Sequence, residues 1–211
     1  MKKYLVIGNP IEHSLSPKLH NHWIRENNIK AVYDMKKLNE NDIKRIISEI
    51  KNEKVHGINV TIPFKKSVIP FLDKLTPIAN EAQSVNTIFK KDNKIIGDNT
   101  DIGGFEKSLK NIRYSVKNKK AFILGAGGVA PSIILALKKL GASKIYLSNR
   151  TKEKAKNLSK IHSNIKIVDW GKNIDFDIII NATSLGLKDD DKIRLDFNKS
   201  GPNKLFYDVI Y

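Results

Sequence analysis

A short run in the second half of the chain constrains the fold most, because it joins a strand, a glycine turn and a helix. Apolar residues 121–124 (AFIL) predict the strand, GAGGVA follows at Gly125 to Ala130, and PSIILALKKLG predicts a helix that stops at Gly141. A helix that starts directly after such a turn offers N–H groups and a positive dipole end to a pyrophosphate. Ordinary tight turns between a strand and a helix show the same pattern, so the motif alone leaves both interpretations open.

The second strand of this unit indicates which dinucleotide would bind. An NAD site usually carries Asp or Glu at the end of that strand, to accept a hydrogen bond from the ribose 2′-hydroxyl. Here the strand ends in SNRTKEK, where Arg150 can form a fork to a 2′-phosphate and Asn149, Thr151 and Lys154 can add donors. Arg150 and Lys154 are also compatible with being two surface cations among many. Because a carboxylate is missing, the sequence favours NADP.

Strands and helices alternate from one end of the chain to the other, which predicts an α/β protein with right-handed βαβ units and largely parallel sheets. Strands are expected at 3–8, 31–38, 55–62, 121–124, 144–149, 165–168, 177–184 and 205–211, with a hairpin at 84–99 that turns at Asp92 and Asn93. Helices are expected at 16–27, 41–51, just past Asp101, 130–140 and from 152 onward, the first with Ser16 as N-cap and Pro17 at its first position.

A glycine pair in NTDIGG, residues 99–104, lies between the two runs and predicts the domain boundary. We expect an N-terminal α/β substrate-binding catalytic domain at residues 1–101 and a Rossmann-like dinucleotide-binding domain at 102–211. Ligands of such sheets bind beyond the carboxyl ends of the strands. The active-site cleft is therefore expected between the two domains.

The stretch GINVTIPFK, residues 57–65, alternates apolar and polar side chains. Ile58, Val60 and Ile62 would share one face of a strand, while Asn59 and Thr61 would share the other. A half-exposed strand alternates in the same way, so the two polar residues could face solvent. Helices packed on both faces of the sheet would cover these two residues, which argues against their facing solvent. A cleft at the ends of the strands is the natural place for Asn59 and Thr61.

Other polar residues of the first half also follow strands. Ser14 and Ser16 stand at a predicted helix start, which suits a carboxylate ligand because hydroxyls, amides and the helix dipole meet there. An N-cap role for Ser16 is compatible with that binding role. Asn86 and Asp101 lie at or near strand ends, although Asp101 taken alone resembles a helix cap.

Composition excludes several classes of function. The net charge is +16, yet the 38 basic residues are spread along the chain and none of their runs is interleaved with aromatic residues that could stack bases. We therefore expect no nucleic-acid partner. With zero cysteines the fold uses neither disulfides nor thiolate ligands, and we expect no metal. Asn9, Pro10 and Glu12 interrupt the first apolar run, so we expect a cytoplasmic protein without membrane association.

Seven ordered motifs then resemble one family. They are S-x-S-P at 14–17, N-V-T-x-P-x-K at 59–65, N-T at 86–87, N-T-D at 99–101, GAGG at 125–128, N-R-T at 149–151 and N-A-T at 181–183. Their order and spacing resemble those of shikimate dehydrogenase, and the resemblance covers the whole chain. It implies NADPH-dependent, reversible reduction of 3-dehydroshikimate to shikimate, a step of chorismate and aromatic amino-acid biosynthesis.

The resemblance also implies roles for individual residues, in a monomer or homodimer. Lys65 and Asp101 would be the catalytic pair, and which of them moves the proton stays open. The substrate would be bound by Ser14, Ser16, Asn59, Thr61, Asn86 and Tyr211. NADP would be bound by Gly125, Ala126, Gly127, Gly128, Val129, Ala130, Asn149, Arg150, Thr151, Lys154 and Thr183. The chemistry requires such a lysine, because an ammonium can stabilise charge on the carbonyl oxygen and deliver its proton.

The chain departs from the family pattern after LFYDVIY. Family members usually continue with an N-P-x-x-T segment and with helices that pack on the substrate domain, one of which offers a glutamine to the substrate, whereas this chain stops at Tyr211. We expect weaker substrate binding and an exposed apolar seam as a result. Two alternatives to this function remain. One is a relative that accepts quinate or uses NAD, and the other is a protein that binds nucleotide or substrate without turnover.

Overall fold

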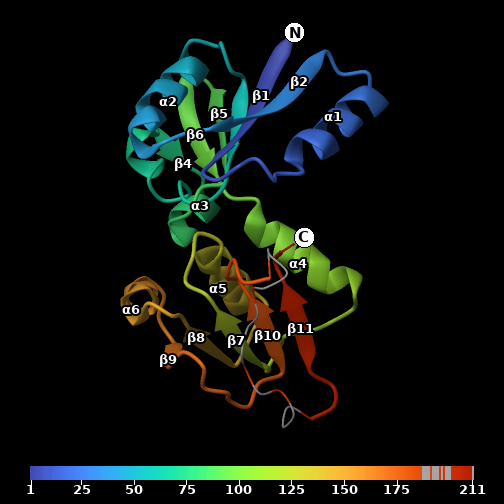
Figure 1. The fold of residues 1–211 in the computed structure, drawn as a ribbon, viewed down its shortest axis with the longest axis vertical. Helices are drawn as coiled ribbons and strands as arrows, with labels where there is room; N and C mark the ends of the chain where they lie inside the picture. Colours follow the sequence, from blue (N-terminus) through green and yellow to red (C-terminus); the bar gives the residue numbers. More distant parts are fainter. Residues whose placement is uncertain (187–190, 192–194, 196, 198–200, 211) are drawn as a thin grey trace. The chain divides into compact units, whose positions relative to one another are not determined.

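The computed structural model describes residues 1–186, 191, 195, 197 and 201–210, and the chain divides into two compact units, Met1–Thr100 and Asp101–Tyr211 (Figure 1). Each unit has its own sheet. The alternation of strands and helices in the sequence predicts this α/β class, and the prediction is confirmed.

The first unit has a mixed six-stranded sheet in the order β2-β1-β3-β5-β6-β4. Its strands are β1 Lys2–Gly8, β2 Ala31–Lys37, β3 Gly57–Val60, β4 Lys74–Leu75, β5 Thr87–Lys91 and β6 Lys94–Asp98. Its helices are α1 Ser16–Glu26, α2 Ile43–Lys51 and α3 Pro77–Ala82, with 3₁₀ turns at Glu40–Asp42 and Ile69–Phe71. β1 pairs in parallel with β2 and β3, whereas β5 runs antiparallel to both β3 and β6.

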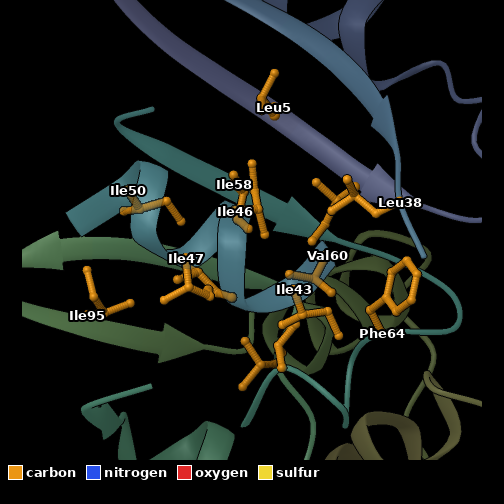
Figure 2. Close-up of a cluster of buried hydrophobic side chains, with 14 of the residues drawn as sticks. Leu5, Leu38, Ile43, Ile46, Ile47, Ile50, Ile58, Val60, Phe64 and Ile95 are labelled. Atoms are coloured by element: carbon orange, nitrogen blue, oxygen red, sulfur yellow. The ribbon is translucent and has the colours of Figure 1, made fainter. Parts of the chain in front are cut away.

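Side chains of β1 alternate between the two faces of this sheet. Leu5 and Ile7 join the core beneath α2, whose Ile43, Ile46, Ile47 and Ile50 recur at helical spacing and are all buried (Figure 2). Val6 joins the cluster on the opposite face, together with Tyr33 of β2 and Ile24 of α1. Because Val6 is in register with Asn59 of β3, the Asn59 side chain belongs to the α1 face.

Two local predictions are corrected and one is confirmed. Helix α1 begins at Ser16, with Leu15 in the cap position and without a side-chain cap, so the prediction of Ser16 as N-cap is wrong. The hydroxyl of Ser14 accepts the amide N–H of Ser16 at 3.3 Å, which satisfies that amide and lets the helix start one residue earlier. Strand β3 ends at Val60, and Ile62 is 54% exposed instead of sharing the buried face of Ile58. The turn at Asp92 and Asn93 is confirmed, with φ of 49° and 58°.

The second unit contains a five-stranded sheet that is parallel throughout, in the order β11-β10-β7-β8-β9. Its strands are β7 Lys120–Leu124, β8 Lys144–Ser148, β9 Ile165–Val168, β10 Ile178–Asn181 and β11 Leu205–Asp208. Its helices are α4 Asp101–Asn111, α5 Ala130–Lys139 and α6 Lys152–Ile161. Strand β7 lies centrally and leads through the glycine turn into α5, in which every residue from 130 to 137 is buried.

Helix α1 differs from α5 because it carries apolar residues on its exposed side. It contains no buried residue, and Leu15, Leu19 and Trp23 recur at helical spacing with about half of their surface exposed. No helix within the described part of the chain combines the length and the apolar character needed to cross a membrane.

Candidate active site

A connected polar network in the first unit links residues of β2 and β3 with the start of β5 and with Thr100, which follows β6. Asn59 Nδ2 donates to Thr87 Oγ1 at 3.2 Å and to the carbonyl oxygen of Asn86 at 3.4 Å. Thr87 Oγ1 donates to Asn86 Oδ1 at 3.0 Å, and Asn86 Nδ2 donates to Thr100 Oγ1 at 2.8 Å. The hydroxyl of Tyr33 donates to Asn59 Oδ1 at 2.6 Å. The structure therefore brings Asn59 and Asn86, two predicted substrate residues, into one network, and Asn59 faces protein groups on the α1 side.

The loop that carries Ser14 and leads into α1 at Ser16 is tied to the end of β2. Asn9 Nδ2 donates to the carbonyl oxygen of Leu38 at 3.2 Å, and Lys37 Nζ lies 2.8 Å from Glu12 Oε1. The hydrogen bond from Lys37, supported by backbone amides, lowers the pKa of Glu12 to about 2. Because this ion pair is exposed, it positions the loop more than it stabilises the fold.

Thr61 and Lys65 follow β3 in a tight turn. The Thr61 amide donates to the carbonyl oxygen of Ile7 at 2.9 Å, which extends the β1–β3 pairing by one bond. Phe64 is 2% exposed and anchors the turn in the core, and the carbonyl oxygen of Lys65 accepts from the Val85 amide at 2.8 Å. Only 8% of the Lys65 surface is exposed, which is unusual for lysine. Asp101 is the first residue of α4 and directly follows Thr100, whose amide donates to Asn86 Oδ1 at 2.9 Å.

His20 of α1 stacks on the ring of Tyr33, with the ring centroids 4.2 Å apart and the planes at 8°. Partial burial lowers the pKa of His20 below its usual 6.5, because the imidazolium would lose water on folding. Below pH 6.5 the unfolded chain thus takes up a proton at this position more readily than the folded chain, so acid favours unfolding.

We expect the stability contributed by neutral His20 to be present above pH 6.5 and to be lost as the pH falls through the lowered pKa. The variant His20→Phe keeps an aromatic ring against Tyr33 and removes this titration. Urea unfolding measured from pH 7.5 down to pH 5 should show a smaller loss of stability in the variant than in the wild type. The other histidines are common to both proteins, so an equal loss would contradict the assignment to His20.

The glycine turn of the second unit is built for a close approach of backbones. Gly125 has a φ of +105°, and a Cβ placed there would lie 2.6 Å from the carbonyl oxygen of Ala182. A Cβ at Gly127 would meet only that same oxygen, at 3.8 Å, so the turn is open at this second glycine. The Gly125 amide donates to the Ser148 carbonyl at 2.8 Å, which seats the turn between the carboxyl ends of β8 and β10. Such a tight first glycine followed by an open second one fits the pyrophosphate of a dinucleotide.

The end of β8 braces this turn. Asn149 Oδ1 accepts from the Ala126 amide at 3.0 Å, and Asn149 Nδ2 donates to the carbonyl oxygen of Thr151 at 2.8 Å. Arg150 and Lys154 are exposed and close to this point in sequence, at the start of α6. Asn149 therefore holds the glycine turn, and Arg150 and Lys154 are two exposed cations that follow it in the sequence.

Asn181 organises the loop after β10, which includes the predicted cofactor residue Thr183. Asn181 Oδ1 accepts from the amide and hydroxyl of Thr183, at 3.1 and 2.7 Å. Asn181 Nδ2 donates to the Leu185 carbonyl at 2.9 Å and to the carboxylate of Asp208 at 3.1 Å, which links the loop to β11. Tyr211, a predicted substrate residue, lies outside the described residues.

Comparisons with known proteins agree with these two regions. Residues 6–88 match the family described as shikimate dehydrogenase substrate binding domain, and residues 107–187 match shikimate / quinate 5-dehydrogenase. A curated relative from Pelagibacter ubique, named shikimate dehydrogenase (NADP(+)), is 59% identical over 210 residues, which are 100% of this chain and 79% of the relative. The chain belongs to the shikimate dehydrogenase family. It is therefore an enzyme of the oxidoreductase class.

Solved structures of shikimate dehydrogenases share the fold. The Aquifex aeolicus enzyme has a TM-score of 0.92 and 40% identity, with 100% of this chain and 79% of that chain covered. The Thermus thermophilus enzyme, solved in complex with NADP(H) and shikimate, has a TM-score of 0.89 and 27% identity, with coverage of 100% and 79%. An α/β substrate domain and a Rossmann-like domain are thus the architecture of this family.

Several residues of the candidate site are missing from the sequence prediction. Tyr33, Thr87 and Thr100 share the network of Asn59 and Asn86, and Asn181 holds the loop of Thr183. Thr87 and Thr100 stand inside the N-T and N-T-D motifs, so each motif carries a signal beyond its asparagine or aspartate. Tyr33 lies in an ordinary strand pattern, and no local signal distinguishes it.

Proposed function

We propose that the protein catalyses the NADPH-dependent, reversible reduction of 3-dehydroshikimate to shikimate, a step in the synthesis of chorismate and the aromatic amino acids. The observation that carries the proposal is the 59% identity over 210 residues to a shikimate dehydrogenase (NADP(+)). The polar network around Asn59 and Asn86 and the built glycine turn add physical support. We expect a cytoplasmic protein that is a monomer or a homodimer. Light scattering would measure the oligomeric state.

In this proposal residues 1–101, which are the first unit and Asp101, form the substrate-binding domain. Ser14 and Ser16 would receive its carboxylate, because two hydroxyls and the start of α1 meet there. Its hydroxyl groups would meet Asn59, Thr61 and Asn86. Tyr211 would complete the set.

Lys65 and Asp101 carry the chemistry in this proposal. As a hydride adds to the carbonyl carbon, negative charge grows on the oxygen, and the Lys65 ammonium stabilises that charge and donates a proton to it. Burial of Lys65 to 8% exposure strengthens this interaction, because water screens it less. Asp101 orients the ammonium and accepts from a neighbouring substrate hydroxyl.

NADP is the cofactor, and bound NADPH supplies the hydride. The turn at 125–130 and Thr183 would hold the pyrophosphate and nicotinamide side, since the turn has the tight and open glycines that this group needs. Asn149, Arg150, Thr151 and Lys154 would hold the adenosine end with its 2′-phosphate.

Steady-state oxidation of shikimate with NADP, followed by absorbance of NADPH, tests the proposed function. Parallel assays with quinate and with NAD should give lower kcat/KM values, and the reverse order would favour a quinate or NAD-dependent relative. Calorimetry measures the affinities for shikimate and for NADP, and together with the turnover assay it distinguishes an enzyme from a protein that only binds these ligands. Tight binding of both ligands without turnover would contradict the proposal and favour the non-catalytic alternative.

Arg150→Ala tests the basis of the NADP preference. Loss of a charge-assisted pair to the 2′-phosphate should raise the KM for NADP by about 10- to 100-fold, as expected for roughly 1.5 to 3 kcal/mol. The KM for NAD should hardly change, because NAD lacks that phosphate. An equal loss with both cofactors would show that Arg150 does not read the 2′-phosphate.

A further inference from the structure

The donor and acceptor directions in the Asn59–Asn86 network are fixed by backbone groups. The Asn86 carbonyl can only accept, so the group of Asn59 that faces it at 3.4 Å must be the nitrogen Nδ2. The Thr100 amide can only donate, so the atom of Asn86 that faces it at 2.9 Å must be Oδ1. Neither carboxamide can be turned by 180° without setting like groups against each other.

Thr87 is the side chain that joins the two carboxamides. Its hydroxyl accepts from Asn59 Nδ2 at 3.2 Å, so its single hydrogen is directed to Asn86 Oδ1 at 3.0 Å. Thr87 is the first residue of β5, where it is in register with Asn59 of the neighbouring strand β3. The strand pairing thus holds the hydroxyl between the two side chains. Asn59 donates a hydrogen bond to it, and Asn86 accepts one from it.

We propose that Thr87 is a positioning residue that holds both Asn59 and Asn86 in the orientations that the backbone groups select, and so presents them to the substrate. The inference rests on the proposed function, which assigns these two asparagines to substrate hydroxyls. The orientation of a carboxamide decides whether it offers a donor or an acceptor, and hydroxyl recognition depends on that choice. Thr87 thereby contributes to specificity for a hydroxylated ring although it acts through its neighbours.

The variant Thr87→Val keeps the branched shape of the side chain and removes the hydroxyl. Asn59 then loses one acceptor and Asn86 loses one donor, so both carboxamides become less restricted. We expect the KM for shikimate to rise about 3- to 10-fold, the range for losing a neutral hydrogen bond, because Asn59 Nδ2 keeps the Asn86 carbonyl and Asn86 Oδ1 keeps the Thr100 amide. The KM for NADP should not change, because all of these contacts lie within the first unit.

Two matched variants separate positioning from a structural role. Thr87→Ser restores the hydroxyl and should restore the KM for shikimate. Thr76→Val removes another threonine hydroxyl of the same unit, which donates to Asp98 Oδ1 at 2.6 Å and accepts from the Ala79 amide at 3.3 Å. It should lower the thermal midpoint, because it loses two hydrogen bonds, yet leave the KM for shikimate unchanged.

A double-mutant cycle with Asn59→Ala completes the experiment. If Thr87 acts through Asn59 and Asn86, the effect of Thr87→Val on kcat/KM should be smaller in the Asn59→Ala background than in the wild type. An unchanged KM in Thr87→Val, or a serine variant as impaired as the valine variant, would overturn the inference while wild-type activity stands. A wild type that neither turns over nor binds shikimate would instead refute the proposed function, and the inference with it.

Discussion

Replacing Lys65 by alanine is expected to lower the turnover number roughly 100- to 10,000-fold, the range typical of a lost general acid. The contact of the ammonium with the carbonyl oxygen strengthens as charge grows there, so the loss falls on the transition state. The KM for shikimate should change only modestly, because Ser14, Ser16 and the asparagine network would still hold the substrate. Steady-state kinetics of the purified variant with shikimate and NADP would measure both parameters.

The neighbouring Lys66 provides the matched control, since it is exposed and differs from the buried Lys65 by one position. Lys66→Ala should keep the wild-type turnover number. Asp101→Asn should lower turnover in the same direction as Lys65→Ala, because in the proposed mechanism this carboxylate orients the ammonium. A Lys65→Ala variant with normal turnover and a raised KM would make Lys65 a binding residue, and the proton donor would lie elsewhere.

The elements that the sequence predicts well are those that depend on local patterns. The unit at 121–141 combines an apolar strand, a glycine turn and a helix, and β7 and α5 lie where that pattern puts them. Helix α2 repeats isoleucine at helical spacing, and its buried face follows from that period alone. The start of α1 depends instead on which hydroxyl satisfies the first amide, and the Ser14 hydroxyl does so in place of Ser16.

The stretch at 57–65, where a strand is predicted up to Ile62, shows where local alternation stops being informative. Its first half is confirmed, because Ile58 and Val60 are buried on one face. The pairing ends before Pro63, and the Phe64 amide donates to the Thr61 carbonyl at 3.0 Å, so the chain turns and Ile62 points outward. Alternation cannot reveal that turn, although proline in a strand pattern is a warning of it.

The residues of the candidate site also fall into two groups, those that sequence motifs identify and those that only the fold shows. The resemblance to a family identifies Asn59 and Asn86 because they stand in short motifs. Their partner Tyr33 lies on β2, with β1 between it and β3, so the contact with Asn59 depends on strand order and register. Such tertiary pairing has no signature in a single sequence, and only the folded sheet shows it.

Gly125→Ala should destabilise the second unit by about 2 to 5 kcal/mol, since two separate costs combine. The φ of +105° is unfavourable for any residue with a Cβ, and that Cβ would lie 2.6 Å from the Ala182 carbonyl oxygen and 2.9 Å from the Thr183 nitrogen. These neighbours are backbone atoms, so relief requires moving the ends of β7 or β10. Urea or thermal unfolding would measure the loss, and the KM for NADP should rise at the same time.

Gly127→Ala separates the role of the turn in stability from its proposed role in cofactor binding. Its Cβ would meet only the Ala182 oxygen, at 3.8 Å, and its φ lies outside the left-handed region, so stability should stay near that of the wild type. In the proposed cofactor site the added methyl group would stand where the backbone approaches the pyrophosphate, so the affinity for NADP should fall, which calorimetry measures. Unchanged NADP affinity in this variant would place the pyrophosphate away from the turn. Normal stability in Gly125→Ala would show that the turn has room to relax around the new side chain.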